Sequence, residues 1–318
     1  MKMEVKAMNR CFEIIPLDTW FFRGSTPMES GMMNIVSIFP PPVSVIKGTF
    51  WTELCNTKNK DYSDGMIDGN IPFEVTGIFI KKDDSIYVSA PATWYYDCEK
   101  KITNGSNLKG IPLKIAKKNN TMTALGMTSS AGDVYFVKAE QDSKSLSGGW
   151  IKLEFLKKPK DTFESDSVLF PGDIYSLENR TNVALDENRR AKDGQLFSST
   201  HIRINDGFSL VTAFDKELDL MRGKFFFGGE KRISEYKGFN ELNIDFTNTN
   251  GEGEYMSLVP VEATEETVSA IITSGKLYLT AGWDMKKRYH KPSSNWIPAG
   301  AVFNRNINGY CIKLAEVK

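Results

Sequence analysis

Short extended patterns dominate this sequence, and helical patterns are few. The first strand pattern runs from Phe12 to Phe22 and ends at Arg23-Gly24. Three prolines at 40–42 follow, and apolar residues then recur at helical spacing from Val43 to Leu54, which predicts a strand, a proline turn and a helix. Strands interleaved with few helices indicate an α+β fold.

The chain up to residue 237 continues in the same way. Strand patterns at 73–80 and 85–90 flank the turn-forming residues Lys82-Asp83-Asp84, which predicts a hairpin. The Asn-, Gly- and Lys-rich stretch 104–121 has no apolar period and indicates a loop. Further elements are expected as helices at 150–156 and 215–221, and as strands at 195–204, 208–214 and 224–228.

A similar alternation restarts beyond Lys237. Its predicted elements are strands at 240–246 and 255–261, a helix at 265–273 and a strand at 276–281. Thr264 can cap that helix and Gly275 can end it. We therefore predict two ferredoxin-like (RRM-like) modules. The first covers 1–237, with a loop insertion at about 98–130 and a protruding thumb-like hairpin at about 180–197, and the second covers 238–318.

Composition places the chain among folded proteins. It has 318 residues, 41% apolar and 25% charged, and no apolar run approaches the roughly 20 residues that cross a bilayer. Lys2, Glu4 and Lys6 stand where a secretory signal needs an apolar core, so we expect a cytoplasmic protein with no membrane partner. Four scattered cysteines without a CxxC motif favour reduced thiols over disulfides or a zinc cluster.

Charge is balanced in total but segregated along the chain. There are 40 Lys and Arg residues and 40 Asp and Glu residues, yet 100–120 holds six lysines and no acid. Conversely, 239–275 holds seven acids and no Lys or Arg. This segregation suggests a basic face for a polyanion and an acidic face for a protein, while the alternative is that both runs are solvated surface.

The two candidate nucleotide-binding motifs are incomplete. Gly275-Lys276 lacks the first glycine of a phosphate loop, and Gly251-Glu252-Gly253 lacks the third glycine of a dinucleotide fingerprint. His201 and His290 are the chain's two histidines, and neither has an identifiable catalytic partner. We predict no enzymatic activity, no cofactor and no metal.

Three segments instead carry the features of RNA contacts. In 180–197, a turn at Asp193-Gly194 between extended arms suggests a hairpin with bases near its tip. In 225–232, Gly228-Gly229 can bring backbone N–H groups close to a polyanion beside two cations. In 282–292, aromatic rings alternate with bases, which suits stacking and phosphate neutralisation on single-stranded RNA. Each segment also has a purely structural interpretation.

These segments resemble a known family. The strings PLDTWFFRG at 16–24, FPPPVSVIKG at 39–48, RTNVALD to AKDGQLF at 180–197, FFGGEKR at 226–232 and GWDMKKRYHKP to IPAG at 282–300 are similar, in order, to the signatures of the third subunit of the Cmr complex. That subunit is a RAMP-superfamily protein of the type III-B CRISPR effector. Gly24-Ser25 and Asn182 depart from the usual residues of the first and third strings.

The resemblance implies a non-catalytic subunit in antiviral defence. It would bind the 5′ repeat-derived tag of crRNA, dock with the large polymerase/cyclase-bearing subunit of the complex and adjoin neighbouring RAMP subunits. The hairpin at 180–197 would be a thumb against the RNA backbone. The candidate RNA-binding residues, all within the five strings, are Arg23, Ser44, Lys47, Arg180, Thr181, Arg189, Gly228, Gly229, Lys231, Arg232, Trp283, Lys286, Lys287, Arg288 and Lys291.

Two other functions stay open at this point. One is a RAMP endoribonuclease that processes CRISPR transcripts, with His201 or His290 as general acid or base. The other is a stand-alone protein-interaction module whose basic segments are only solvated loops.

Overall fold

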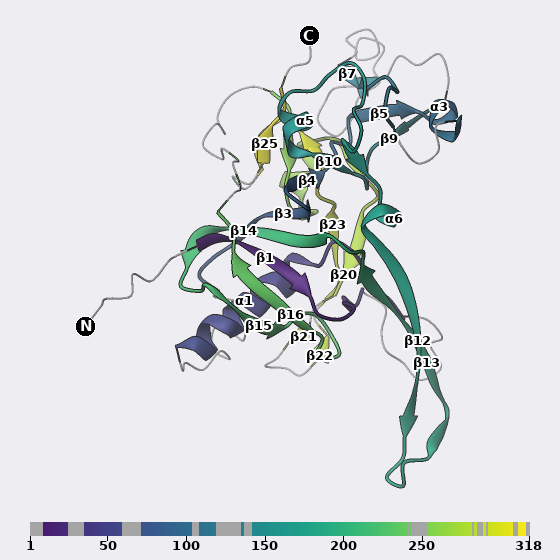
Figure 1. The fold of residues 1–318 in the computed structure, drawn as a ribbon, viewed down its shortest axis with the longest axis vertical. Helices are drawn as coiled ribbons and strands as arrows, with labels where there is room; N and C mark the ends of the chain where they lie inside the picture. Colours follow the sequence, from purple (N-terminus) through teal and green to yellow (C-terminus); the bar gives the residue numbers. More distant parts are fainter. Residues whose placement is uncertain are drawn as a thin grey trace, which may run out of the picture. The chain divides into compact units, whose positions relative to one another are not determined.

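The computed structural model describes residues 9–24, 35–58, 71–103, 108–118, 135–136, 142–240, 242, 244, 253–281, 283–284, 289–290, 292–307 and 311–315. They form two compact units, each assembled from three segments. Unit 1 is Met1–Val75, Ile174–Asn240 and Leu279–Ser294, and unit 2 is Thr76–Asp173, Glu241–Tyr278 and Asn295–Lys318. Strands greatly outnumber helices (Figure 1), which confirms the strand-rich α+β class.

The units interrupt each other in sequence, whereas a single division after residue 237 was expected. The physical reason is that residues 76–173 bond to the C-terminal part of the chain: the Ile78 N–H donates to the Leu258 carbonyl at 3.1 Å, and the Ala92 N–H donates to the Gly300 carbonyl at 2.9 Å. The ferredoxin-like character of the modules stays a prediction.

Four antiparallel strands form the sheet of unit 1, in the order β14-β1-β16-β15. They are β1 (Asn9–Pro16), β14 (Phe208–Leu218), β15 (Arg222–Phe226) and β16 (Ile233–Gly238). Helix α1 (Val43–Thr57) packs against them, and the ring of Phe50 lies 4.8–5.9 Å from the rings of Phe12, Phe214, Phe225 and Tyr236. The predicted helix after the three prolines is thus confirmed.

A long hairpin extends the same unit (Figure 1). Strands β12 (Tyr175–Leu185) and β13 (Ala191–Ile204) pair antiparallel, and β2 (Ile35–Val36) adds to β13 in parallel. The hairpin is confirmed, but the turn is at Asp186–Arg190 and not at Asp193-Gly194. The reason is local, because the Asp186 carboxylate accepts hydrogen bonds from the N–H groups of Asn188 and Arg190.

The last segment of unit 1 contains a two-strand pair. Strands β21 (Trp283–Asp284) and β22 (Tyr289–His290) pair antiparallel.

Unit 2 begins with the predicted hairpin, which is confirmed as β3 (Val75–Lys82) and β4 (Ser85–Ser89). Strands β10 (Trp150–Lys152) and β11 (Val168–Leu169) extend it in the order β11-β10-β4-β3. Smaller elements complete this part of the chain: β5 (Trp94–Asp97), α3 (Cys98–Thr103), β6 (Lys114–Ile115), β7 (Lys117–Lys118), β8 (Tyr135–Phe136), β9 (Ser143–Ser145), α5 (Leu153–Lys157) and α6 (Pro171–Ile174).

The C-terminal part of unit 2 has its own core. Strands β17 (Tyr255–Ser257), β19 (Ile271–Thr273), β24 (Val302–Phe303) and β25 (Cys311–Lys313) lie in the order β19-β24-β17-β25. Tyr255, Phe303 and Ile297 are buried among their neighbours. The remaining elements are β18 (Val261–Glu262), α7 (Glu265–Ser269), β20 (Tyr278–Thr280) and β23 (Ser294–Ile297).

Several predicted elements differ from the observed ones. The strand at 12–22 ends at Pro16, and the helix expected at 215–221 is instead the end of β14. The helix expected at 265–273 stops at Ser269, because Ile271 and Thr273 pair with β24. The loop expected at 104–121 contains β6 and β7. Residues 104–107 and 119–121, like most of 240–246, lie outside the described part.

Among the described residues, no helix has the length and apolar character needed to cross a membrane. All four cysteines are free thiols.

Candidate nucleic-acid interface

Residues 17–24 leave the sheet after Pro16 and connect three other parts of unit 1. Trp20 exchanges two backbone hydrogen bonds of 2.8 Å with Ile202 of β13. The Phe21 carbonyl accepts from the Gly229 N–H at 2.8 Å, and the Phe22 carbonyl accepts from the Ile38 N–H at 2.9 Å. Trp20 also stacks on Phe39 with ring centroids 6.5 Å apart, and the Asp18 carboxylate lies 3.5 Å from Arg180. Residues 17–24, themselves in the first family-like string, therefore contact three of the other four strings.

The loop at 228–231 is shaped by its approach to that segment. Gly228 has φ +83°, and a Cβ there would lie 2.6 Å from the Phe21 carbonyl oxygen. A Cβ on Gly229 would lie 2.8 Å from the Phe21 ring. Real Cβ contacts are never so short, so both glycines are required for packing against the chain's own residues 21 and 22.

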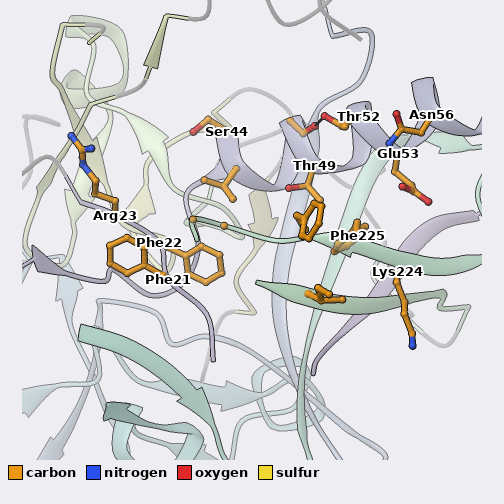
Figure 2. Close-up of a pocket in the computed structure, with 16 residues that line it drawn as sticks. Phe21, Phe22, Arg23, Ser44, Thr49, Thr52, Glu53, Asn56, Lys224 and Phe225 are labelled. Carbon is orange, nitrogen blue, oxygen red and sulfur yellow. Dashed lines mark hydrogen bonds between the residues drawn. The ribbon is translucent and has the colours of Figure 1, made fainter. Parts of the chain in front are cut away.

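A pocket of about 670 Å³ opens beside this loop. Helix α1 runs along one side, with Phe21 and Phe22 near one end and Lys224 and Phe225 near the other (Figure 2). The full lining is Phe21, Phe22, Arg23, Ser44, Val45, Gly48, Thr49, Thr52, Glu53, Asn56, Lys224, Phe225, Phe226, Gly228, Gly229 and Ile233.

The two ends of the pocket differ in charge. The N-terminus of α1 has Pro42 as its N-cap, without a side-chain hydrogen bond, and no acid in its first turn. No acid of its first turn therefore offsets the positive dipole end, which lies beside Ser44 at the same end of the pocket as Arg23 (Figure 2). The opposite end holds Glu53, whose carboxylate accepts a 2.9 Å hydrogen bond from the Tyr236 hydroxyl.

A network of ion pairs joins residues 17–24, the glycine loop and the base of the hairpin. The Asp18 carboxylate accepts from Arg232 at 2.5 Å and lies 3.5 Å from Arg180. Arg232 also donates to Glu230 at 2.8 Å, while Glu178 pairs with both Arg180 and Arg203. Three carboxylates thus face three guanidinium groups.

The network also lowers carboxylate pKa values. The Thr19 backbone N–H, together with Arg232 and Arg180, holds the pKa of Asp18 below its ordinary value. Hydrogen bonds from Arg203 and Arg180 do the same for the pKa of Glu178. Both carboxylates therefore stay ionised, and the arginines beside them are already compensated.

His201 lies beneath this network and is fully buried. Its Nε2 lies 3.1 Å from the Ser199 hydroxyl and 3.4 Å from the Glu230 carboxylate, and its Nδ1 lies 3.3 Å from the Thr19 hydroxyl. The ring stacks on Phe21 at 5.0 Å. Burial lowers its pKa despite the neighbouring Glu230, so the imidazole is neutral near pH 7.

Comparison with protein families now decides the relationship. The family model described as CRISPR-associated protein (Cas_Cmr3) matches residues 12–242. The chain belongs to this family. No curated protein sequence gives a significant match.

The fold is shared with solved members of CRISPR complexes. A chain from the cryo-EM structure of the type III-B Cmr-beta bound to cognate target RNA and AMPPnP matches with TM-score 0.54 and 17% identity, over 93% of this chain and 86% of that one. A second Cmr-beta structure, bound to cognate target RNA, matches with TM-score 0.54 and 16% identity over the same shares. A chain of the type III-A Csm3-Csm4 subcomplex matches at TM-score 0.43 and 9% identity, over 93% of each chain.

The structure brings some of the predicted RNA contacts of this CRISPR-associated chain together and separates others. Arg23, Ser44, Gly228 and Gly229 line the one pocket described above. Arg180 and Arg232 instead face Asp18.

Lys47 pairs with Glu74 at 2.5 Å. Thr181 and Arg189 are exposed on the hairpin, and Lys231 is exposed in the glycine loop. Trp283 belongs to β21, while Lys286, Lys287, Arg288 and Lys291 lie outside the described residues.

Sequence reasoning missed the acidic half of the network and the polar side of the pocket. Asp18 and Glu230 stand inside two of the quoted strings, and Glu178 is two residues before Arg180, so a signal for charge compensation was present. Thr49, Thr52 and Asn56 recur at helical spacing and mark the polar stripe of α1 that lines the pocket.

Proposed function

We propose that this chain is a non-catalytic RNA-binding subunit of a type III CRISPR effector complex, made of two ferredoxin-like modules. It binds the 5′ repeat-derived tag of crRNA and docks with the large subunit and with neighbouring RAMP subunits. The observation that carries the proposal is the contact of residues 17–24 with three other family-like strings, through Phe39, Arg180 and Gly229, in a chain that belongs to the Cas_Cmr3 family.

The pocket supports a single-stranded polyanion at its Arg23 end. A helix N-terminus without acids attracts phosphate, and the Arg23 side chain has no ion-pair partner among the described residues. Ser44 adds an exposed hydroxyl that can donate to a phosphate oxygen. By contrast, Arg180 and Arg232 support the proposal indirectly, because their ion pairs with Asp18 fix the hairpin base and the glycine loop in place.

Binding of a labelled tag RNA to the purified full chain tests this assignment. Arg23→Ala should weaken binding about tenfold, because one charge-assisted contact is lost. It should also reduce the slope of log affinity against log salt by about 0.7, the amount expected for one phosphate on a single strand. Arg10→Ala is the matched control, since Arg10 is exposed on β1 outside the pocket. Equal affinities and slopes for the two variants would contradict the assignment.

One of the two candidate residues for an endoribonuclease is inaccessible to a substrate. His201 is fully buried and bonded on both ring nitrogens, so it does not reach a substrate in this conformation. Incubation of the chain with repeat RNA in EDTA should give no discrete product. A product that disappears with His290→Ala would replace the proposal with the nuclease.

A further inference from the structure

The edge of strand β15 presents unpaired backbone groups. β15 is the last strand in its sheet, after β16. The Phe227 N–H donates to the Arg232 carbonyl at 2.7 Å and the Met221 carbonyl accepts from the Gly238 N–H at 2.6 Å, so odd-numbered residues face β16. By the two-residue period of a strand, the N–H and C=O groups of Arg222, Lys224 and Phe226 point away from the sheet.

No hydrogen bond from any other described segment reaches these groups. Proteins commonly protect such an edge with charges, prolines or a covering element. Here the edge carries Arg222 and Lys224, but Phe226 is 59% exposed and its cross-strand neighbour Ile233 is 44% exposed. An exposed aromatic ring on an open edge marks a contact surface.

The edge also borders the pocket. Lys224, Phe225 and Phe226 line it on the sheet side, and Thr52, Glu53 and Asn56 line it on the α1 side (Figure 2). A strand added to β15 would lie about 4.8 Å from it, and alternate side chains would point towards the pocket. The other alternate side chains would lie beside Lys224 and Phe226, which point to the opposite face because Phe225, between them, packs on Phe50 of α1 at 5.4 Å. An extended chain with apolar side chains at those positions can therefore pack on Phe226.

The charged side chains near the β15 edge indicate which kind of molecule can bind there. Arg222 is paired with Glu235 at 3.0 Å, whereas Lys224 has no ion-pair partner among the described residues. A second copy of this chain is disfavoured, because antiparallel pairing centred on Lys224 would place the two Lys224 side chains opposite each other. RNA is disfavoured at this end, because the outward carbonyl groups and the Glu53 carboxylate repel phosphates.

We propose that the β15 edge binds an extended segment of a partner protein, which adds a strand to the sheet, packs an apolar side chain on Phe226 and places an acidic side chain against Lys224. This surface is separate from the Arg23 end of the pocket, and the inference holds whether or not the chain binds RNA.

The test selects eight-residue peptides with alternating apolar and acidic positions against the full chain. We expect selected peptides to bind the wild type and to protect the N–H groups of Arg222, Lys224 and Phe226 from hydrogen exchange. N-methylation of alternate peptide residues, which removes donors and keeps side chains, should weaken binding at least about tenfold.

Two variants at Lys224 distinguish the contribution of backbone hydrogen bonds to peptide binding from the contribution of charge. Lys224→Pro removes an outward N–H, which an edge strand tolerates, and should weaken binding about tenfold more than Lys224→Gln, which keeps the N–H and removes the charge. Unchanged melting temperatures and circular dichroism spectra would show that both variants fold.

Several results would overturn the proposal. One is the absence of any library peptide with a Kd below about 1 mM. Others are equal affinities of N-methylated and unmethylated peptides, and equal peptide affinities of Lys224→Pro and Lys224→Gln. Self-association through this edge, or protection of these N–H groups by RNA in place of peptide, would also overturn it.

Discussion

The two ends of the β12–β13 hairpin differ in what surrounds them. At the base, Ser199, His201 and Ile202 of β13 are buried, with β12 paired along one edge of the strand and β2 and Trp20 along the other. Towards the turn, Val183 and its cross-strand neighbour Leu196 are exposed although both are apolar. One hairpin therefore joins a packed base to an unsupported apolar end.

This difference indicates that one end of the hairpin stabilises unit 1, while the other end is available for contact with another molecule. The base combines buried rings, ion pairs and the glycine loop, so changes there should unfold the unit. The distal end has few neighbours, so changes there should leave folding intact and affect only what the hairpin touches. If this is so, substitutions at the base should lower the free energy of unfolding strongly, and substitutions at the distal end should lower it little.

Trp20→Ala should have the largest effect. Trp20 is fully buried, packs on the rings of Phe22 and Phe227, and donates from Nε1 to the Ser234 hydroxyl at 2.8 Å. Its loss should cost about 3–5 kcal/mol, measured by urea unfolding. Leu185→Ala, at the exposed end, is the control and should cost less than about 0.5 kcal/mol. Similar losses for both variants would show that the two ends are equally packed.

Gly228→Ala should come next, at about 3 kcal/mol. It combines a left-handed backbone with a Cβ 2.6 Å from the Phe21 carbonyl oxygen. Gly110→Ala is the matched control, because Gly110 has φ +77° with nothing within 4 Å of the added Cβ, and should cost about 1 kcal/mol. Equal costs, from thermal unfolding of both variants, would mean that the approach to Phe21 carries no constraint.

These glycines show what sequence could and could not predict. The Gly228-Gly229 pair was identified as a place of close backbone approach, which is correct. The predicted contact with RNA stays a prediction, and the structure adds that residues 21 and 22 of the same chain lie against both glycines. A contact between segments so distant in sequence has no local signal, so its partner could not be predicted.

Secondary structure that depends on local sequence patterns was predicted more reliably than contacts between distant segments. Helix α1 was predicted because Val43, Ile46, Phe50 and Leu54 repeat within one element. The strand from Phe12 was predicted too long, because Trp20 leaves the sheet to pair with β13 and Phe21 leaves it to bond to the glycine loop. The hairpin turn was misplaced because Asp186 closes it through its side chain, an effect that outweighs the freedom of Gly194.

The third prediction concerns pH. Burial lowers the pKa of His201 in the folded state, while the unfolded value is about 6.5, so acidification protonates the unfolded chain first. His201 faces Glu230, Arg180, Arg232 and Glu178, and the net direction stays downward. Stability should therefore fall between pH 7.5 and 5.5, by at most about 1.4 kcal/mol from this group.

The measurement is urea unfolding at both pH values for the wild type and His201→Asn. The variant lacks the titrating ring, so its stability should depend less on pH, although it starts lower because a buried stacked ring is lost. An identical pH dependence in both proteins would remove His201 as the cause. Leu185→Ala should keep the wild-type dependence, since the distal end holds no part of the network.

The smallest effect on stability should come from the double variant Val183→Thr and Leu196→Thr. Threonine keeps the branched strand-forming shape at Val183 and removes apolar surface at both positions, so unfolding should shift by less than about 0.5 kcal/mol. The family resemblance implies that this hairpin is a thumb against the RNA backbone, so loss of apolar surface at its distal end should lower tag affinity about threefold. Leu177→Thr is the control, because Leu177 is equally exposed but lies at the base. A loss of affinity for Leu177→Thr and none for the double variant would place the contact at the base instead, and the packed end of the hairpin would then carry both stability and binding.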